Sequence, residues 1–215
     1  MGFKDKSGEI VGFDFDLAKE VAERLDVEIT FQPIDWAMKE TELASGNIDM
    51  IWNGYTITEE RKEKVLFSEP YLSNSQIIVT MADSDIETKA DLAGKVVATQ
   101  QGSAAFDAII ADETGIAAEF DGGTPILYPT FNDVFNDLES GRSDAIVVDE
   151  VLGRYTMKLK GEEKFAVLTD NFGDEEYGVG LRKEDVALKE AIDATMNDMR
   201  EDGTYDEIYA KWFAE

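Results

Sequence analysis

The sequence predicts an α/β protein made of two similar doubly wound domains that are joined by a two-strand hinge. Helical and strand-like patterns alternate along all 215 residues, which is typical of α/β folds. The stretches LASGNIDMIW (43–52) and LESGRSDAIV (138–147) also share the pattern L-x-S-G-x-x-D-x-I. Each of them predicts a helix end, a glycine cap and the start of a strand. This internal similarity predicts two domains of the same topology.

The first half of the chain predicts helices and strands in alternation. Asp14 is a candidate N-cap for a helix whose apolar residues recur at helical spacing up to Leu25. The stretch VEITFQP (27–33) alternates as a strand, and a short helix follows that closes at Gly46. The remaining elements predicted in this half are a buried strand in NIDMIWNGY (47–55), a short helix capped by Thr58 and a strand at QIIVT (76–80).

The second half of the chain repeats this order. It predicts a strand at KVVAT (95–99), a helix in the stretch that follows, a strand at TPILYP (124–129), a helix from Thr130 to Gly141, a strand at SDAIVVDE (143–150), a strand at EEYGVGL (175–181) and a long helical pattern from Val186 to Phe213 that is interrupted at EDGTYDE (201–207). Two predicted strands, QIIVT (76–80) in the first half of the chain and EYGVGL (176–181) in the second, would carry the chain out of the first domain and back. The domains are therefore predicted as 1–78 plus 176–215 and 79–175. Such a pair of crossing strands predicts a hinge, with a ligand cleft between the domains.

Composition excludes several functions. The chain has 20 basic and 47 acidic residues, so its net charge of −27 argues against binding to nucleic acid or to anionic lipid. It contains no cysteine and no histidine, which excludes thiol chemistry, disulfides, histidine-based catalysis and the usual zinc sites. No cofactor or metal is expected. The acidic stretch DNFGDEEY (170–177) lacks the spacing of a calcium-binding EF-hand and is predicted to be a solvated loop.

A candidate carboxylate site follows the first predicted buried strand, at Asn53, Gly54 and Thr56. Ligands of open α/β sheets bind beyond the carboxyl ends of the strands. Arg61 falls in the first turn of the helix that Thr58 caps. Helix N-termini favour anions, and arginine can bind a carboxylate through two hydrogen bonds. The alternative for Arg61 is an ion pair with a neighbouring glutamate or simple solvation.

The complementary candidate is Asp149, which directly follows the predicted strand of the second domain. A carboxylate at that position can hold an ammonium group. Asp149 is also placed to cap the helix that follows it, and the two roles are compatible. Together, Arg61 and Asp149 would form a clamp for a zwitterion.

At this point the sequence resembles a known family. The motifs that carry the resemblance are GFDFDLAKEVAERL, NGYTITEERKEKVLFSEPY, KVVATQQGSAA, SDAIVVDE, YGVGLRK and REDGTYDEIYAKWF. They look like those of the polar amino-acid-binding proteins of ABC importers, which are type II periplasmic-binding proteins related to the ligand cores of ionotropic glutamate receptors. The resemblance covers essentially the whole chain.

The resemblance implies a role for each candidate residue. Arg61 would bind the α-carboxylate of an amino acid, and Asp149 its α-amino group. The loop at Asn53, Gly54 and Thr56 would contribute backbone and hydroxyl contacts, and Trp36 would cover the ligand side chain. The second domain would add contacts from its first loop, at Gln100, Gly102, Ser103 and Ala104.

The same resemblance implies a non-enzymatic extracytoplasmic protein that captures a free polar L-amino acid and delivers it to the permease of an ABC transporter. The targeting segment would be absent from this chain. An amino-acid sensor domain of a receptor, or a lyase similar to cyclohexadienyl dehydratases, are the alternatives. No acidic residue is clearly presented to a cationic ligand side chain, which favours a neutral polar ligand, but glutamine, cystine, arginine, lysine and histidine all occur among ligands of similar proteins.

The internal similarity also predicts a difference between the domains. The second domain begins with the strand KVVAT (95–99), and the first has no counterpart before its first helix. We therefore expect that the chain lacks one N-terminal strand and the loop after it. The family's loop carries a second aromatic residue and a specificity residue. Its absence predicts impaired ligand binding, or strand exchange with another chain.

Overall fold

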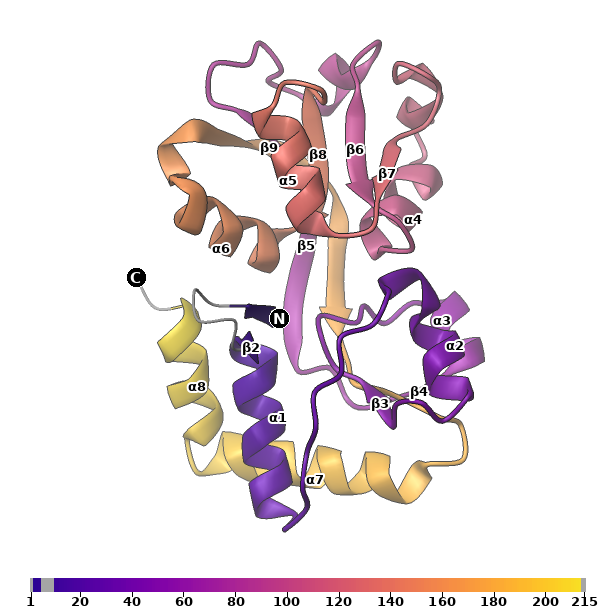
Figure 1. The fold of residues 1–215 in the computed structure, drawn as a ribbon, viewed down its shortest axis with the longest axis vertical. Coiled ribbons are helices and arrows are strands. Elements are labelled where there is room, and N and C mark those ends of the chain that lie inside the picture. Colours follow the sequence, from indigo (N-terminus) through magenta and orange to yellow (C-terminus); the bar gives the residue numbers. More distant parts are fainter. Residues whose placement is uncertain (1, 5–9, 214–215) are drawn as a thin grey trace. The chain divides into compact units, whose positions relative to one another are not determined.

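The computed structural model describes residues 2–4 and 10–213 (Figure 1). The chain divides into two compact units. Unit 1 comprises Met1–Ile34, Met38–Leu72 and Glu176–Glu215, and unit 2 comprises Asp35–Ala37 and Ser73–Glu175. The chain therefore leaves unit 1 and returns to it, and the C-terminal helices belong to the same unit as the first helix.

Unit 1 contains short strands and five helices among the residues described. Its elements are β1 (Phe3–Lys4), β2 (Ile10–Val11), α1 (Phe13–Arg24), α2 (Lys39–Ala44), β3 (Met50–Ile51), α3 (Glu59–Lys64), β4 (Leu66–Phe67), β10 (Gly180–Leu181), α7 (Val186–Glu201) and α8 (Thr204–Phe213). Strands β1 and β2 form an antiparallel pair, and the second sheet has the order β3-β10-β4 with antiparallel pairing throughout. The returning segment thus supplies the central strand of that sheet.

The core of unit 1 is built where α1 packs on α7 and α8 (Figure 1). The predicted apolar stripe of α1 is buried at Phe15, Leu17, Ala18, Val21 and Ala22. The predicted break in the C-terminal helical pattern separates α7 from α8 at Asp202 and Gly203. These elements follow the sequence pattern because amphipathic periodicity selects the face that a helix buries.

Two predictions for unit 1 are wrong. The stretch VEITFQP (27–33) forms no strand, because in the described part of the chain no neighbouring segment pairs with it. Asp14 is not the N-cap of α1; Gly12 takes that position and Asp14 is buried within the first turn. The Asp14 carboxylate instead accepts a hydrogen bond from the backbone N–H of Gly54. An aspartate at this position therefore makes a contact with a residue distant in sequence rather than a helix cap.

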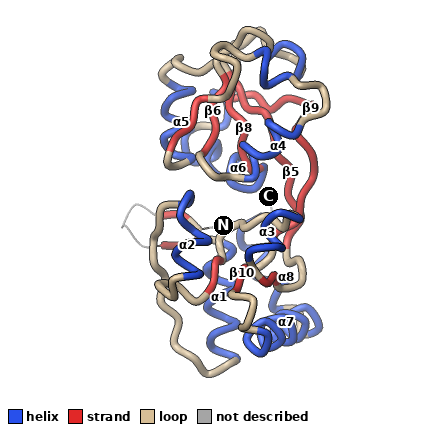
Figure 2. The backbone as a smooth tube through the Cα atoms, turned by 90° about the vertical axis from the view of Figure 1, so that its right-hand side faces the viewer, coloured by secondary structure: helices blue, strands red, loops and turns tan. Residues whose placement is uncertain are grey.

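Unit 2 is built on a five-stranded sheet. Its elements are β5 (Leu72–Met81), β6 (Val97–Gln100), α4 (Ala104–Ala111), β7 (Ile126–Tyr128), α5 (Phe131–Glu139), β8 (Ala145–Asp149), α6 (Glu150–Lys160) and β9 (Phe165–Tyr177), with short 3₁₀ turns at Trp36–Met38, Lys89–Leu92, Ile116–Glu119 and Glu162–Lys164. The strand order is β7-β6-β8-β5-β9. Strand β6 is parallel to β7 and β8, and β5 runs antiparallel to β8. Figure 2 shows α4, α5 and α6 packed around these strands.

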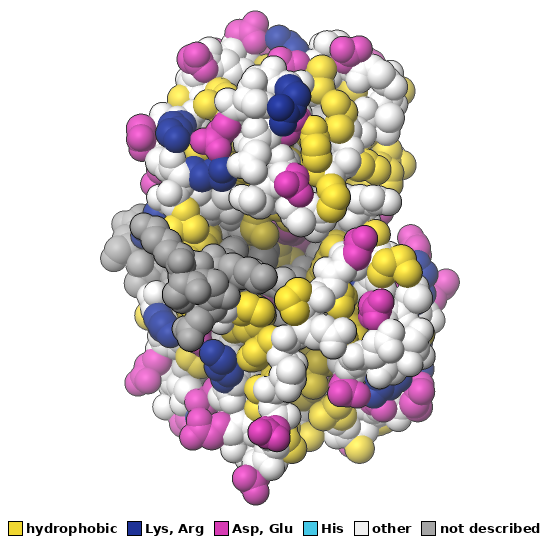
Figure 3. Space-filling model, in the orientation of Figure 1, with side chains coloured by type: hydrophobic (Ala, Val, Ile, Leu, Met, Phe, Trp, Pro, Cys, Tyr) yellow, Lys and Arg dark blue, Asp and Glu magenta, His cyan; other side chains and the backbone are white. Residues whose placement is uncertain are grey.

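Local sequence signals place the helices of unit 2. Thr130 caps α5 by accepting a hydrogen bond from the backbone N–H of Asp133, and Gly141 has the left-handed conformation after its end. Strand β8 is buried along its whole length, as expected of a central strand covered on both faces. Asp137 and Asp149 are buried acidic side chains of this unit, whereas other acidic side chains are spread over the face that Figure 3 shows.

The two segments that connect the units are long strands, and they correct two predictions. The boundary after residue 78 falls too late, because β5 already pairs with β8 at Gln76, opposite Asp149. The stretch DNFGDEEY (170–177) is not a solvated loop but the second half of β9. The prediction followed the acidic composition of this stretch, but the strand buries its aromatic residues Phe172 and Tyr177.

Candidate functional site

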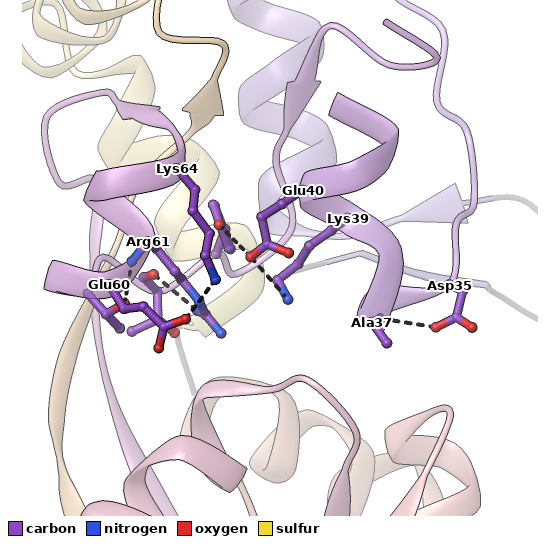
Figure 4. Close-up of polar contacts among 10 residues, drawn as sticks. Asp35, Ala37, Lys39, Glu40, Glu60, Arg61 and Lys64 are labelled. Atoms are coloured by element: carbon purple, nitrogen blue, oxygen red, sulfur yellow. Dashed lines mark hydrogen bonds and ion pairs between the residues drawn. The ribbon is translucent and has the colours of Figure 1, made fainter. Parts of the chain in front are cut away.

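Arg61 is fixed at the start of α3 by the predicted cap. The Thr58 side chain accepts a hydrogen bond from the Arg61 backbone N–H at 3.1 Å. The Arg61 side chain turns inward and is only 4% exposed. Its Nη1 donates to the backbone carbonyl of Thr56 at 3.1 Å (Figure 4). Its guanidinium carbon lies 4.9 Å from the centroid of the Tyr55 ring. A charged group this buried needs polar partners to offset its desolvation.

The glutamates that follow Thr58 pair with lysines. Glu59 pairs with Lys62 at 2.7 Å and Glu60 with Lys64 at 2.6 Å, both on the exposed surface of α3. Figure 4 shows the second of these pairs beside Arg61. These helical pairs follow the i,i+3 and i,i+4 spacing, and they give each of the two carboxylates a lysine partner.

A second buried cation, Lys39, lies beside the same tyrosine. Lys39 is 3% exposed, and its Nζ lies 5.9 Å from the Tyr55 ring centroid and 3.4 Å from Glu40 Oε1. The Tyr55 hydroxyl donates to Glu40 at 2.9 Å (Figure 4). Burial, together with the Glu40 carboxylate, raises the pKa of Tyr55, so its hydroxyl remains a donor. Lys39, Arg61 and Glu40 together carry one excess positive charge.

Sequence reasoning missed Lys39. The available signal was its spacing from Leu43, since the two buried residues of α2 are one helical turn apart. A lysine at a core-facing position is rare unless it is paired or has a function.

The loop between β3 and α3 is held by contacts from the N-terminal part of unit 1. Gly54 has a positive φ of 59°, which favours glycine. Its N–H donates to Asp14 Oδ2 at 2.6 Å, and Asn53 Oδ1 accepts from the Gly2 N–H at 2.7 Å. Thr56 is buried and forms an isolated β-bridge with Tyr177. Of the predicted residues in this loop, Thr56 therefore contacts Arg61 directly, whereas Asn53 and Gly54 contact Gly2 and Asp14.

In unit 2 the predicted loop follows β6. Gln100 donates through Nε2 to the carbonyl of Pro129 at 2.9 Å. Ser103 caps α4 by accepting from the Phe106 N–H, and its hydroxyl donates to the Gln100 carbonyl at 2.7 Å. Gly102 has a positive φ of 70°, and a Cβ there would lie 3.2 Å from Ala37 Cα. Ala37 therefore lies against the loop at Gly102, and the short segment Asp35–Ala37 belongs to unit 2. This segment includes Trp36, which is half-buried.

Ala104 is buried at the first position of α4. Strands β6 and β8 are parallel neighbours, so the loop after Gln100 and the residue Asp149 lie at the same edge of the sheet. The predicted residues of unit 2 are therefore together.

Asp149 ends β8 within a cluster of polar side chains. Gln76 Nε2 donates to Asp149 Oδ1 and to Glu175 Oε1, both at 2.8 Å. Asn74 Nδ2 donates to Glu175 Oε1 at 2.7 Å and to Asp149 Oδ1 at 3.3 Å. Burial, and next the charge of Asp149, raise the pKa of Glu175 to about 8. Sequence reasoning did not select Glu175, which it placed where an acidic stretch predicted to be a solvated loop overlaps the start of the predicted strand EEYGVGL (175–181).

The alternative role of Asp149 as a helix cap is only partly met. Asp149 occupies the N-cap position of α6, but its side chain makes no capping hydrogen bond. The backbone N–H of Val151 donates instead to Asn74 Oδ1 at 3.2 Å. Asn74 therefore supplies the side-chain oxygen that accepts from this N–H group at the start of α6.

Comparison with known proteins identifies the family. The chain matches the bacterial extracellular solute-binding proteins, family 3, over residues 1–215. The chain belongs to this family. It is 33% identical over 217 residues to the lysine/arginine/ornithine-binding periplasmic protein of Escherichia coli (strain K12), covering 98% of the chain and 82% of that protein. It is 32% identical to the ABC transporter glutamine-binding protein GlnH of Bacillus subtilis (strain 168), covering 97% and 75%.

Solved structures of related solute-binding proteins have the same fold. An ABC uptake transporter substrate-binding protein from Streptococcus pneumoniae with bound histidine is 39% identical, with a TM-score of 0.97 over 100% of this chain and 88% of that one. An ancestral arginine-binding protein bound to arginine is also 39% identical, with a TM-score of 0.90 over 99% and 92%. These matches confirm the type II periplasmic-binding-protein fold and the predicted family. Proteins of this family bind solutes rather than catalyse reactions, and its members are extracytoplasmic.

Two further features of the described residues bear on function. No helix within residues 10–213 is long and apolar enough to span a membrane. The described side chains also include no group of three or more acidic residues arranged to hold a metal ion.

Proposed function

We propose that this solute-binding protein captures a free polar L-amino acid outside the cytoplasm and delivers it, chemically unchanged, to the permease of an ABC transporter. The observation that carries the proposal is the pair of buried, oppositely charged sites. Unit 1 contains the cations Arg61 and Lys39, and unit 2 contains the carboxylates Asp149 and Glu175. A zwitterionic amino acid presents the complementary charges, an α-carboxylate and an α-ammonium group.

Each end of the ligand has a chemically suited partner in this proposal. The Arg61 guanidinium binds the carboxylate, since a planar fork of N–H donors matches its two oxygens. Asp149 accepts hydrogen bonds from the ammonium group. Trp36 covers the ligand side chain, and the loop from Gln100 to Ala104 adds contacts. The ligand is drawn from the class bound by the relatives, whose names and structures include lysine, arginine, ornithine, glutamine and histidine.

A titration of the protein with each common L-amino acid tests this function. We expect one or a few of them to produce a saturable change in tryptophan emission, because Trp36 covers the ligand. Such a ligand, at a concentration of 100 times its Kd, should also stabilise the fold by about 2.7 kcal/mol. Trp36→Phe should abolish the emission change while calorimetry still detects binding, and mass spectrometry should recover the ligand unchanged. Absence of binding across the whole panel would contradict the proposed function.

The proposal includes strand exchange between two copies of the chain, at the edge of the β3-β10-β4 sheet. Strand β3 pairs with β10 on one side, and the described residues show no strand on its other side. Residues 28–35 have no regular secondary structure and are largely exposed, with no ladder partner in the described part of the chain. The backbone N–H and C=O groups on the open side of β3 and along residues 28–35 can therefore pair with another copy of the chain by strand addition.

This pairing predicts a concentration-dependent dimer. Thr30→Pro removes a backbone N–H from the exposed segment and should shift the protein to monomer, because proline cannot donate to a ladder. Thr30→Ala, which keeps that N–H, should dimerise as the parent does. Sedimentation equilibrium of the three proteins makes the comparison, and a parent that stays monomeric at high concentration would rule out the exchange.

A further inference from the structure

The Asp149 and Glu175 carboxyl groups are drawn together by shared donors. The amide nitrogens of Asn74 and Gln76 each donate to one oxygen of both groups, so Asp149 Oδ1 and Glu175 Oε1 converge on the same two N–H₂ groups. Two ionised carboxylates held this close repel each other strongly. A single shared proton removes that repulsion, as it does wherever two carboxylates share one site.

The surroundings of Glu175 favour the protonated state. The side chains that face it from β8 and β5 are Asp149, Asn74 and Gln76, and Asp149 is the ionisable one among them. The neighbouring Asp174 makes a different contact, because its carboxylate accepts from the Ser75 hydroxyl at 2.7 Å in an exposed position. Burial and the Asp149 charge both raise the pKa of Glu175, to about 8, against the weaker opposing effect of the two amides.

A second observation indicates a missing donor in this cluster. Gln76 is 1% exposed, and its Oε1 finds no hydrogen-bond partner among the described residues, although its Nε2 binds both carboxylates. A buried acceptor without a donor costs about 1–3 kcal/mol. The cluster therefore offers hydrogen-bond acceptors in excess of donors, which is the complement of a cationic N–H group.

We propose that Glu175 and Asp149 form one ammonium-recognising pair, which holds a single proton in the ligand-free protein and releases it to solvent when an α-ammonium group binds. This inference rests on the proposed function and deepens it, because it assigns a second acidic residue to the ligand site and couples binding to a proton. The ligand keeps its three ammonium protons. The charge of the pair changes from −1 to −2 as the cation arrives.

The coupling sets the direction of the pH dependence. Below the pKa of the pair, binding has to expel one proton, so affinity should rise about tenfold per pH unit between pH 6 and pH 7.5. Above that pKa the pair is already ionised and the rise should level off. A neutral residue at position 175 has no proton to release and should give a flat profile over the same range.

Calorimetry with L-arginine and L-glutamine as probes measures the proton directly. At pH 6.5, titrations in phosphate and in Tris should differ in heat by an amount that corresponds to about one proton released per ligand bound. Glu175→Gln should abolish both this difference and the pH dependence of Kd. Asp174→Asn is the matched control on the same strand and should retain both.

The outcomes separate the two proposals. Binding by the parent without a buffer-dependent heat, or a Glu175→Gln profile that follows the parent's, would overturn the proton-releasing pair and leave the proposed function in place. Failure of the parent to bind any amino acid in the panel would overturn the proposed function.

The proton can also be detected without ligand, through stability. A carboxyl whose pKa is higher in the folded than in the unfolded protein stabilises the fold below its unfolded pKa, and this contribution is lost as pH rises through the folded pKa. The melting temperature of the parent should therefore fall relative to that of Glu175→Gln between about pH 4.5 and pH 8. Parallel curves for the two proteins would show that no proton is held, and would overturn the inference whatever the ligand.

Discussion

Replacement of Arg61 by alanine is expected to weaken amino-acid binding by about 2–5 kcal/mol, or about 30- to several-thousand-fold. The reason is that the substitution removes a charge-assisted contact from a buried position and leaves the ligand carboxylate without its partner. Arg61 also bonds the Thr56 carbonyl and stacks on Tyr55, so part of the loss comes from the loop that it supports. Calorimetry of parent and variant with the ligand found in the amino-acid panel gives the difference.

A ligand without a carboxylate separates the two contributions. Agmatine and histamine are the amines that correspond to L-arginine and L-histidine. If Arg61 binds the carboxylate, Arg61→Ala should reduce the affinity for the amino acid far more than the affinity for the amine. Lys62→Ala is the matched control, because Lys62 lies on the same helix but pairs with Glu59 at the surface. Equal losses for amino acid and amine, with the fold intact, would remove Arg61 from the carboxylate-binding role.

Features set by neighbouring residues were predictable from the sequence. Thr58 and Thr130 both cap the helices that follow them, and Gly46 and Gly141 both have the left-handed conformation after a helix end. These signals work because a cap is satisfied within one helical turn and does not depend on the rest of the fold. The position of Arg61 behind the Thr58 cap followed from the same local rule.

Features that depend on distant partners were not predictable in the same way. VEITFQP has the alternation of a strand, but a strand requires a neighbour, and the described residues supply none to this segment. DNFGDEEY has the composition of a surface loop, but pairing in the sheet of unit 2 makes it part of β9. Tertiary context therefore overrode local propensity in opposite directions at these two places.

The candidate site was incomplete for the same reason. Both predicted residues are marked by a local sequence signal. Arg61 follows a helix cap, and Asp149 follows an apolar stretch that predicts a buried strand. Lys39 and Glu175 carry no such mark, and their burial becomes visible only when Tyr55 and Asp149 are brought beside them by contacts distant in sequence. Charged residues of this kind look like solvated surface residues until the fold is known.

Phe13→Ala is expected to destabilise unit 1 by about 3–5 kcal/mol, the range for truncating a buried phenylalanine. Phe13 is 1% exposed at the start of α1. Its ring packs against Tyr205, Tyr209 and Phe213 of α8, with centroid distances of 5.9, 6.0 and 5.0 Å. The substitution would leave a cavity at the point where the last helix of the chain meets the first.

Urea unfolding followed by circular dichroism measures this loss, with Leu159→Ala as control, because Leu159 is 65% exposed on α6 and its truncation should cost little. Polar contacts also join α1 and α8, with Lys211 and Trp212 both donating to Asp16 and Arg24 donating to Thr204. If these surface contacts held α8 in place by themselves, Phe13→Ala would cost less than about 1 kcal/mol. A loss of about 3–5 kcal/mol would show that the aromatic cluster around Phe13 holds the returning segment, Glu176–Glu215, to the N-terminal part of unit 1. That segment also supplies β10, the central strand of the sheet of unit 1.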